Sequence, residues 1–147
     1  MNAVTLHPSI LRAYDIRGIY DQSLRAADAI AIGRAFAACL TNKSLGKKVI
    51  VGRDGRLSSP TLAKALIEGL VDGGADVTDI GCGPTPMLYF AAAHLNADGA
   101  IQVTGSHNPP THNGFKMVMG GKSFFGPEIT DLGELCAAGV SSQNGGK

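Results

Sequence analysis

KVIVGRDGRLSSPTLAKALIEGLVDGGADVTDI, residues 48–80, is the stretch of sequence that decides the fold. Residues 48–52 place three consecutive β-branched side chains between a lysine and a glycine, which predicts a short buried strand. Ser59 and Pro60 then open a helix, with the serine as its N-cap and the proline in its first turn, and a glycine pair ends it. Residues 75–80 predict a second strand. A strand–helix–strand unit of this kind predicts a right-handed crossover within a parallel sheet.

Elements of the same two kinds flank this unit on both sides. Upstream, the alanine-rich residues 24–40 predict a helix, with Ser23 as its N-cap. Downstream, the pattern predicts a helix, two strands and a final helix, at residues 85–95, 100–103, 115–119 and 127–137. The alternation predicts an α/β fold, with three layers in the order α/β/α and a mainly parallel mixed sheet.

Length and composition indicate a single packed domain. The chain has 147 residues, of which 44% are hydrophobic, and this is enough to bury a core. We expect the domain to occupy residues 1–138. Residues 139–147 are rich in serine and glycine, so we expect them to form a linker or a frayed tail.

Charge and hydropathy narrow the class of partner. The formal net charge of +1 provides no electrostatic footprint for nucleic acid or for an anionic membrane surface. No apolar run approaches the roughly 20 residues that span a bilayer. The N-terminal residues show no signal-peptide pattern. We therefore expect a soluble, cytoplasmic protein that binds neither nucleic acid nor membrane.

The cysteines and histidines match no recognised spacing for a metal site. The three cysteines lie far apart and are predicted to be reduced thiols: Cys39, Cys82 and Cys136. A serine–histidine hydrolase is also disfavoured, because His107 directly follows Ser106 and the chain has no G-x-S-x-G motif.

Two polar loops leave predicted strands at the edge where α/β sheets form their sites. One comprises residues 53–58. The other, residues 104–113, begins Thr-Gly-Ser-His-Asn-Pro and is called the serine loop below. In the second loop Gly105 permits a sharp turn that presents Ser106 at the end of a strand. From the local pattern alone, Ser106 is either a hydroxyl bonded within a turn or a nucleophile, and the turn is the commoner use.

Three basic side chains are candidates for a site at these loops: Arg53 begins the first loop, Lys116 follows the second, and Arg17 lies in a polar motif near the start of the chain. Lys116 stands between two apolar residues on a predicted strand, and points either to solvent or back over the serine loop. Guanidinium groups bind phosphate through paired hydrogen bonds, so Arg17 and Arg53 around one loop would form an anion site. The ordinary alternative for each arginine is a surface ion pair, such as Arg53 with Asp54.

Four motifs then follow one another in order. They are AYDIRG at residues 13–18, VGRDGRLSSP at 51–60, GPTP at 83–86, and TGSHNPP at 104–110 followed by NGFK at 113–116. With these motifs the chain resembles the first domain of the α-D-phosphohexomutase family, and most of all its bacterial phosphomannomutase/phosphoglucomutase branch. The resemblance extends from about Ile10 to Cys136.

The resemblance implies an intramolecular phosphotransferase of the isomerase class. In that family a phosphorylated serine donates its phosphoryl group to a hexose 1-phosphate. The resulting hexose 1,6-bisphosphate reorients, and the serine takes the other phosphate back. By this resemblance Ser106 is the phosphocarrier, its phosphate is a ligand of Mg²⁺, the substrate is a sugar phosphate, and the bisphosphate is the intermediate and activator.

The remaining site residues follow from the resemblance by motif position. Lys116 matches a lysine near the transferred group, with an acid/base or charge-stabilising role. Arg17 matches an active-site arginine, and His107 is expected to shape the serine loop and act with it in catalysis. Three further residues are expected to bind phosphate or sugar: Tyr14, Asn108 and Arg53.

The related enzymes have four domains, whereas the resemblance here covers the first. The metal loop, the sugar-reading loop and the phosphate-binding loop of the other three domains have no counterpart in this sequence. We therefore expect the second to fourth domains as partners, an incomplete Mg²⁺ site, and negligible turnover by this chain alone. The alternative is a non-catalytic phosphate-binding or interaction module derived from this domain.

Overall fold

The computed structural model describes residues 4–7, 10–11, 16–105, 109–123 and 127–139. Strands and helices alternate through much of this part of the chain. In order they are β1 (Ile16–Ile19), α1 (Ala26–Asn42), β2 (Lys48–Arg53), α2 (Ser59–Asp72), β3 (Asp76–Cys82), α3 (Thr85–His94), β4 (Gly99–Val103), β5 (His112–Met119), β6 (Lys122–Ser123) and α4 (Pro127–Ala138).

The strands form one sheet in the order β1-β5-β4-β2-β3, and β6 pairs with β5. β2 is parallel to both of its neighbours, β3 and β4. β5 is antiparallel to β4, to β1 and to β6, so β5 alone runs against the other described strands. The predicted mixed, mainly parallel sheet is confirmed.

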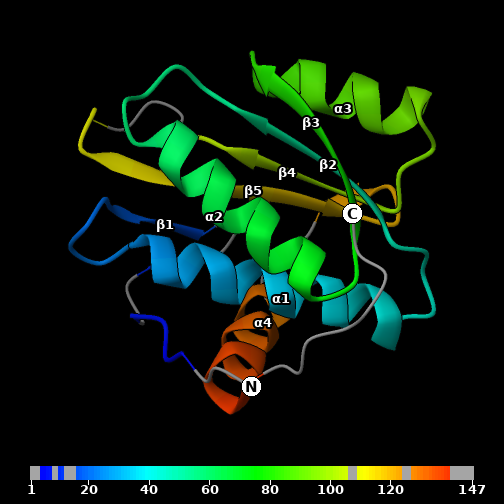
Figure 1. Cartoon of the computed structure of the whole chain (residues 1–147), viewed down its shortest axis with the longest axis horizontal. Helices are drawn as coiled ribbons and strands as arrows, with labels where there is room; N and C mark the ends of the chain where they lie inside the picture. Colours follow the sequence, from blue (N-terminus) through cyan, green and yellow to red (C-terminus); the bar gives the residue numbers. More distant parts are fainter. Residues whose placement is uncertain (1–3, 8–9, 12–15, 106–108, 124–126, 140–147) are drawn as a thin grey trace.

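Helices cover both faces of this sheet, which confirms the three layers (Figure 1). Alternate strand residues such as Val49 and Val51 pack with α1, α2 and α4 in the larger core, where Phe36 and Phe115 are fully buried. The intervening Ile50 packs with α3 in a smaller core on the other face. The twofold alternation of side chains along a strand produces this division.

Two short strands, β1 and β6, were not predicted from the sequence. The predicted start of a third strand, β5, was too late in the chain. β1 has four residues and β6 has two, and both pair with β5, so tertiary pairing rather than local pattern makes them strands. β5 begins at His112 rather than at residue 115, because residues 112–114 pair with β1.

The predicted N-caps were both wrong. Ser23 accepts a hydrogen bond from the Ile19 amide at 3.0 Å, and α1 begins at Ala26, where Asp28 instead accepts from the Arg25 amide at 2.8 Å. α2 begins with Ser59, so the preceding Ser58 stands at the N-cap position, and the Ser59 hydroxyl instead donates to Asp54 and accepts from the Asn113 Nδ2.

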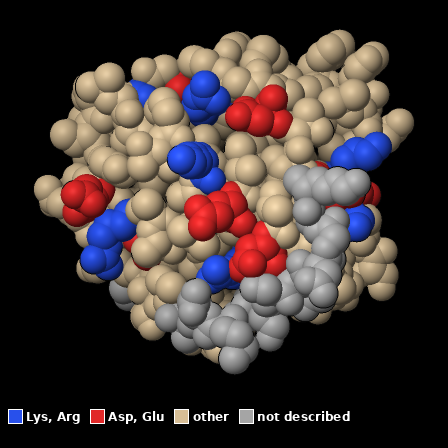
Figure 2. Space-filling view, in the orientation of Figure 1, with Lys and Arg blue, Asp and Glu red and all other residues tan. Residues whose placement is uncertain are grey.

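Charged side chains of both signs are interspersed on the face shown in Figure 2, so this face carries no extended field of one sign. Within the described residues, none of the helices combines the length and the apolar character that crossing a bilayer requires.

Candidate active site

The loops after β2 and β4 lie side by side at one edge of the sheet, as the sequence predicted. The two strands are parallel neighbours, with Arg53 opposite Val103 at their ends. Just beyond, the Asp54 amide donates to the Val103 carbonyl oxygen at 2.9 Å. The Thr104 amide then donates to the carbonyl oxygen of Gly114 on β5, also at 2.9 Å. The start of the serine loop is thereby fixed to both neighbouring strands.

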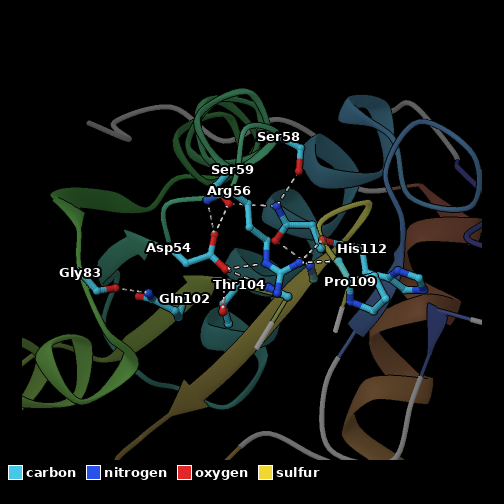
Figure 3. Close-up of polar contacts among 12 residues, drawn as sticks. Asp54, Arg56, Ser58, Ser59, Gly83, Gln102, Thr104, Pro109 and His112 are labelled. Carbon is cyan, nitrogen blue, oxygen red and sulfur yellow. Dashed lines mark hydrogen bonds and ion pairs between the residues drawn. The ribbon is translucent and has the colours of Figure 1, made fainter. Parts of the chain in front are cut away.

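The carboxylate of Asp54 is the centre of the polar contacts between these loops (Figure 3). From the serine loop it accepts the Thr104 hydroxyl at 2.9 Å and the Gly105 amide at 3.1 Å. From the β2–α2 loop it accepts hydrogen bonds from the Arg56 Nε at 3.0 Å and the Arg56 amide at 3.1 Å, and from α2 it accepts one from the Ser59 hydroxyl. One carboxylate thus joins the β2–α2 loop, the start of α2 and the start of the serine loop.

These contacts also set the charge of Asp54. Burial by itself would raise the pKa of this carboxyl group. The hydrogen bonds from Ser59, from the Arg56 and Gly105 amides and from Thr104 stabilise the ionised form and together lower the pKa below its ordinary value. Asp54 is therefore an anion at neutral pH.

Arg56 extends the network to the far end of the serine loop. Its Nη1 donates to the Pro109 carbonyl oxygen at 2.6 Å and to the His112 carbonyl oxygen at 3.1 Å. Its guanidinium group also lies against Gly105, where a methyl group would overlap it. The arginine thus contacts the serine loop on both sides of residues 106–108.

A second polar contact joins the start of β5 to the start of α2. The Asn113 side chain is fully buried, and its Nδ2 donates to the Ser58 Oγ at 2.8 Å and to the Ser59 Oγ at 2.9 Å. On the other side of β4, the buried Gln102 donates from Nε2 to the Gly83 carbonyl oxygen at 2.8 Å. The loops at this edge are therefore held by buried amide side chains as well as by backbone pairing.

Lys116 and Arg17, both expected in the site, lie on the same face of the sheet. Lys116 stands opposite Gln102, and its neighbours on β5 face the larger core, so its own side chain is directed to the other face. Arg17 stands opposite Gly114, two residues from Lys116, and alternation directs it to that same face. Both are half-buried and lie close to where the serine loop meets β4 and β5.

Arg53 does not form the surface ion pair with Asp54 that was the ordinary alternative to a phosphate contact. Its Nη1 lies 3.6 Å from Asp79 Oδ1 on β3, while Asp54 is engaged by Arg56 instead. The ion pair anticipated between Arg53 and Asp54 is therefore replaced by two separate pairs. Four expected site residues lie outside the described residues: Tyr14, Ser106, His107 and Asn108.

Three further residues of the site were not predicted from the sequence: Asp54, Arg56 and Asn113. The signal for the first two was present, because a carboxylate and an arginine two residues apart follow a buried strand in a loop. Asn113 was placed in a loop rather than on a strand, and its contact with α2 depends on tertiary structure.

The described residues do not form a ligand set for Mg²⁺. Among them, no three histidine, cysteine, aspartate or glutamate side chains gather as a metal group would require. Asp54, the carboxylate bonded to the serine loop, already accepts hydrogen bonds on both of its oxygens. We accordingly assign no step to a metal.

A family model described as phosphoglucomutase/phosphomannomutase, alpha/beta/alpha domain I, matches residues 8–138. The chain belongs to this family. The family resemblance inferred from the four motifs is therefore confirmed, and the match covers most of the expected domain.

Curated relatives in this family carry mutase names. A phosphomannomutase/phosphoglucomutase of Pseudomonas aeruginosa is 50% identical over an alignment of 148 positions, which covers 95% of this chain and 31% of that protein. A phosphoglucomutase of Neisseria gonorrhoeae is 46% identical over 123 residues, covering 84% of this chain and 26% of the relative. The chain thus spans less than a third of the length of these relatives.

Solved structures of the family share the fold. A phosphoglucomutase/phosphomannomutase family protein from Burkholderia thailandensis matches with a TM-score of 0.86 and 42% identity, over 97% of this chain and 32% of that one. A structure described as a possible phosphomannomutase from Thermus thermophilus matches with a TM-score of 0.81 and 28% identity, over 94% of this chain and 31% of that one.

Proposed function

We propose that this chain is the phosphate-carrying domain of a phosphohexomutase, which interconverts the 1-phosphate and the 6-phosphate of a hexose such as mannose or glucose. Ser106 is the phosphocarrier in this proposal. Two findings support it: the chain is a domain I of a family whose relatives carry mutase names, and the segment with Ser106 leaves β4 at the edge of the sheet where sites form.

The reaction has two transfers that balance each other. In the first, the phosphoryl group leaves the Ser106 Oγ for the C6 hydroxyl of a hexose 1-phosphate. The hydroxyl loses its proton, Oγ gains one, and a hexose 1,6-bisphosphate results. After the bisphosphate reorients, the Ser106 Oγ loses its proton and attacks the phosphorus on the C1 oxygen. The bond between that phosphorus and the C1 oxygen breaks, the C1 oxygen gains a proton, and the hexose 6-phosphate is released. Each turnover thereby restores the phosphorylated serine.

Positive charge beside the serine loop is the observation that carries this proposal. Phosphoryl transfer depends on positioning and on stabilisation of the charge on the transferred oxygens. Arg17 and Lys116 are two cations on one face of adjacent strands, next to the ends of the serine loop. We assign Arg17 to the phosphoryl oxygens, and Lys116 to the Oγ, where its ammonium group supplies a proton or stabilises developing charge.

The resemblance supplies the other roles. His107 is assigned to the catalytic loop, and Tyr14, Asn108 and Arg53 to the phosphate or the sugar. Mg²⁺, the 1,6-bisphosphate as activator and the second to fourth domains as partners belong to the same proposal. Because the described residues offer no ligand set for Mg²⁺, no role is assigned to these residues in holding it.

Mutase assays on the native polypeptide, isolated from its host cells, test the proposal. With glucose 1-phosphate or mannose 1-phosphate and a trace of the bisphosphate, we expect Ser106→Ala to abolish turnover. Lys116→Met is expected to lower kcat by about a hundredfold or more, as loss of an acid/base group does. Lys122→Met, on β6, is the matched control and is expected to retain activity. Full activity in Ser106→Ala would overturn the proposal.

The alternative module predicts a different result. A non-catalytic relative of this domain would bind inorganic phosphate without forming phosphoserine and would show no turnover in the native polypeptide. For residues 1–147 alone we expect negligible turnover under either function, so the native polypeptide is the discriminating sample. Robust turnover by residues 1–147, abolished by Ser106→Ala, would contradict our expectation that other domains are required.

A further inference from the structure

The β2–α2 loop holds the serine loop from both ends. At the near end, the Asp54 carboxylate accepts from the Thr104 hydroxyl and the Gly105 amide, at 2.9 and 3.1 Å. At the far end, the Arg56 Nη1 donates to the carbonyl oxygens of Pro109 and His112, at 2.6 and 3.1 Å. The three residues between these ends include Ser106.

Asp54 and Arg56 also bond to each other, which makes the two ends one unit. The Arg56 Nε donates to the Asp54 Oδ2 at 3.0 Å, the same oxygen that accepts from Thr104 and Gly105. A guanidinium group can do this because its donors project in fixed directions from one plane. Movement of either end of the serine loop is therefore resisted through the same pair (Figure 3).

The pair is in turn anchored to regular structure. The Ser59 hydroxyl, in the first turn of α2, donates to Asp54 Oδ1 and accepts from the Asn113 Nδ2 of β5. The Asp54 amide is bonded to the end of β4. The side chain of Arg56 is 14% exposed and that of Asp54 is 23% exposed, so these charges are less exposed to solvent than ordinary surface ion pairs.

We propose that Asp54 and Arg56 are positioning residues, which hold the described residues at the two ends of the serine loop, and that phosphoryl transfer depends on this restraint. The role in transfer rests on the proposed function of Ser106. Neither residue of the pair is assigned a contact with substrate. Their effect is geometric, and small displacements of reacting groups lower transfer rates steeply.

Amide exchange measured by NMR on residues 1–147 tests whether the pair holds the loop. Arg56→Gln keeps much of the aliphatic stem but loses the charged fork, and Arg56→Lys keeps the charge on a group that cannot bridge Asp54 and both carbonyls. The control is Arg34→Gln, because Arg34 is 15% exposed and pairs with Asp72 away from the site. We expect both Arg56 variants to accelerate exchange at Gly105 and His112 about tenfold, and the control to leave it unchanged.

Kinetics of the native polypeptide test whether holding the loop matters for transfer. We expect Arg56→Gln to lower kcat per folded molecule about tenfold or more, with KM for the hexose phosphate changed less than about twofold. The folded fraction is measured by circular dichroism on the same samples, because a purely structural role would change that fraction alone. Arg34→Gln is expected to keep kcat per folded molecule.

Three results would overturn the inference. One is unchanged exchange at Gly105 in both Arg56 variants, and another is an equal acceleration in Arg34→Gln. The third is faster exchange with an unchanged kcat per folded molecule, which would leave the pair as a stabilising contact only. An unphosphorylated, dispensable Ser106 would instead defeat the proposed function, and the exchange measurement would still report whether the pair holds the loop.

Discussion

Replacement of Gly105 by alanine tests the packing of the serine loop on Arg56. A Cβ at residue 105 would overlap the Cζ, Nε and Nη1 atoms of the Arg56 side chain. Arginine side chains are flexible, so an unrestrained one would move aside at little cost. This one is restrained by hydrogen bonds from Nε to Asp54 at 3.0 Å and from Nη1 to Pro109 and His112 at 2.6 and 3.1 Å.

The expected magnitude follows from those restraints. A hydrogen bond to a charged group contributes about 1.5–3 kcal/mol, and displacement of the guanidinium group breaks one or two of them. Water replaces part of this loss, since the Arg56 side chain is 14% exposed. Replacing a glycine also stabilises the folded state by about 0.4–1 kcal/mol through the entropy of the unfolded chain. We therefore expect Gly105→Ala to lower the free energy of unfolding by about 2 kcal/mol.

Urea unfolding of residues 1–147 measures this value, with Gly55→Ala as the matched control. Gly55 lies in the β2–α2 loop, and a Cβ there would meet no atom of the described residues within 4 Å. We expect that control to change the free energy of unfolding by less than about 0.5 kcal/mol. Equal and small changes for the two variants would refute the close contact between Gly105 and Arg56.

Three further predictions concern the helices, the thiols and the charge of Asp54. Gly69→Ala in α2 should destabilise the fold by about 2–4 kcal/mol in urea unfolding, because its Cβ would overlap the Ile30 carbonyl oxygen of α1. Gly133→Ala should cost less, because the nearest described atoms to its Cβ belong to the flexible side chain of Leu11. In the folded protein a thiol reagent should modify the exposed Cys82 alone, because burial raises the pKa of Cys39 to about 11 and that of Cys136 to about 12. Equal labelling of all three cysteines before unfolding would contradict this prediction. The lowered pKa of Asp54 means that its charge stabilises the fold above the ordinary value of about 3.9 and ceases to do so as the pH falls through the folded value. Asp54→Asn should therefore lose stability relative to the wild type at pH 7, with the difference shrinking below about pH 4, and a difference independent of pH would refute the assignment.

The sequence predicted the elements whose pattern is local. The three β-branched residues of β2 and the helical spacing between Ser59 and the glycine pair identified the central crossover, and the order of elements then predicted the layers. β1 and β6 lacked such a pattern because they are strands only through pairing with β5. The caps failed for a related reason: Ser23 and Ser59 satisfy other partners that lie beyond the helix they were assigned to.

The candidate site divides in the same way. Lys116 and Arg17 were identified by motif, and strand alternation then brought them to one face. Asp54 and Arg56 were visible as charged residues after a strand, but their bonds reach residues about fifty positions away, which local pattern does not encode. Arg53 shows the reverse, since its expected neighbour in sequence is not its partner in space.

Mass spectrometry of the native polypeptide is the most direct test of the central claim, that Ser106 carries the phosphate. The protein is isolated from its host cells with phosphatases inhibited, and the peptide containing residue 106 is sequenced. We predict a phosphate on Ser106 that is lost on incubation with excess hexose 1-phosphate and restored by the hexose 1,6-bisphosphate. A Ser106 that carries no phosphate in the isolated protein and gains none from the hexose 1,6-bisphosphate would contradict this claim.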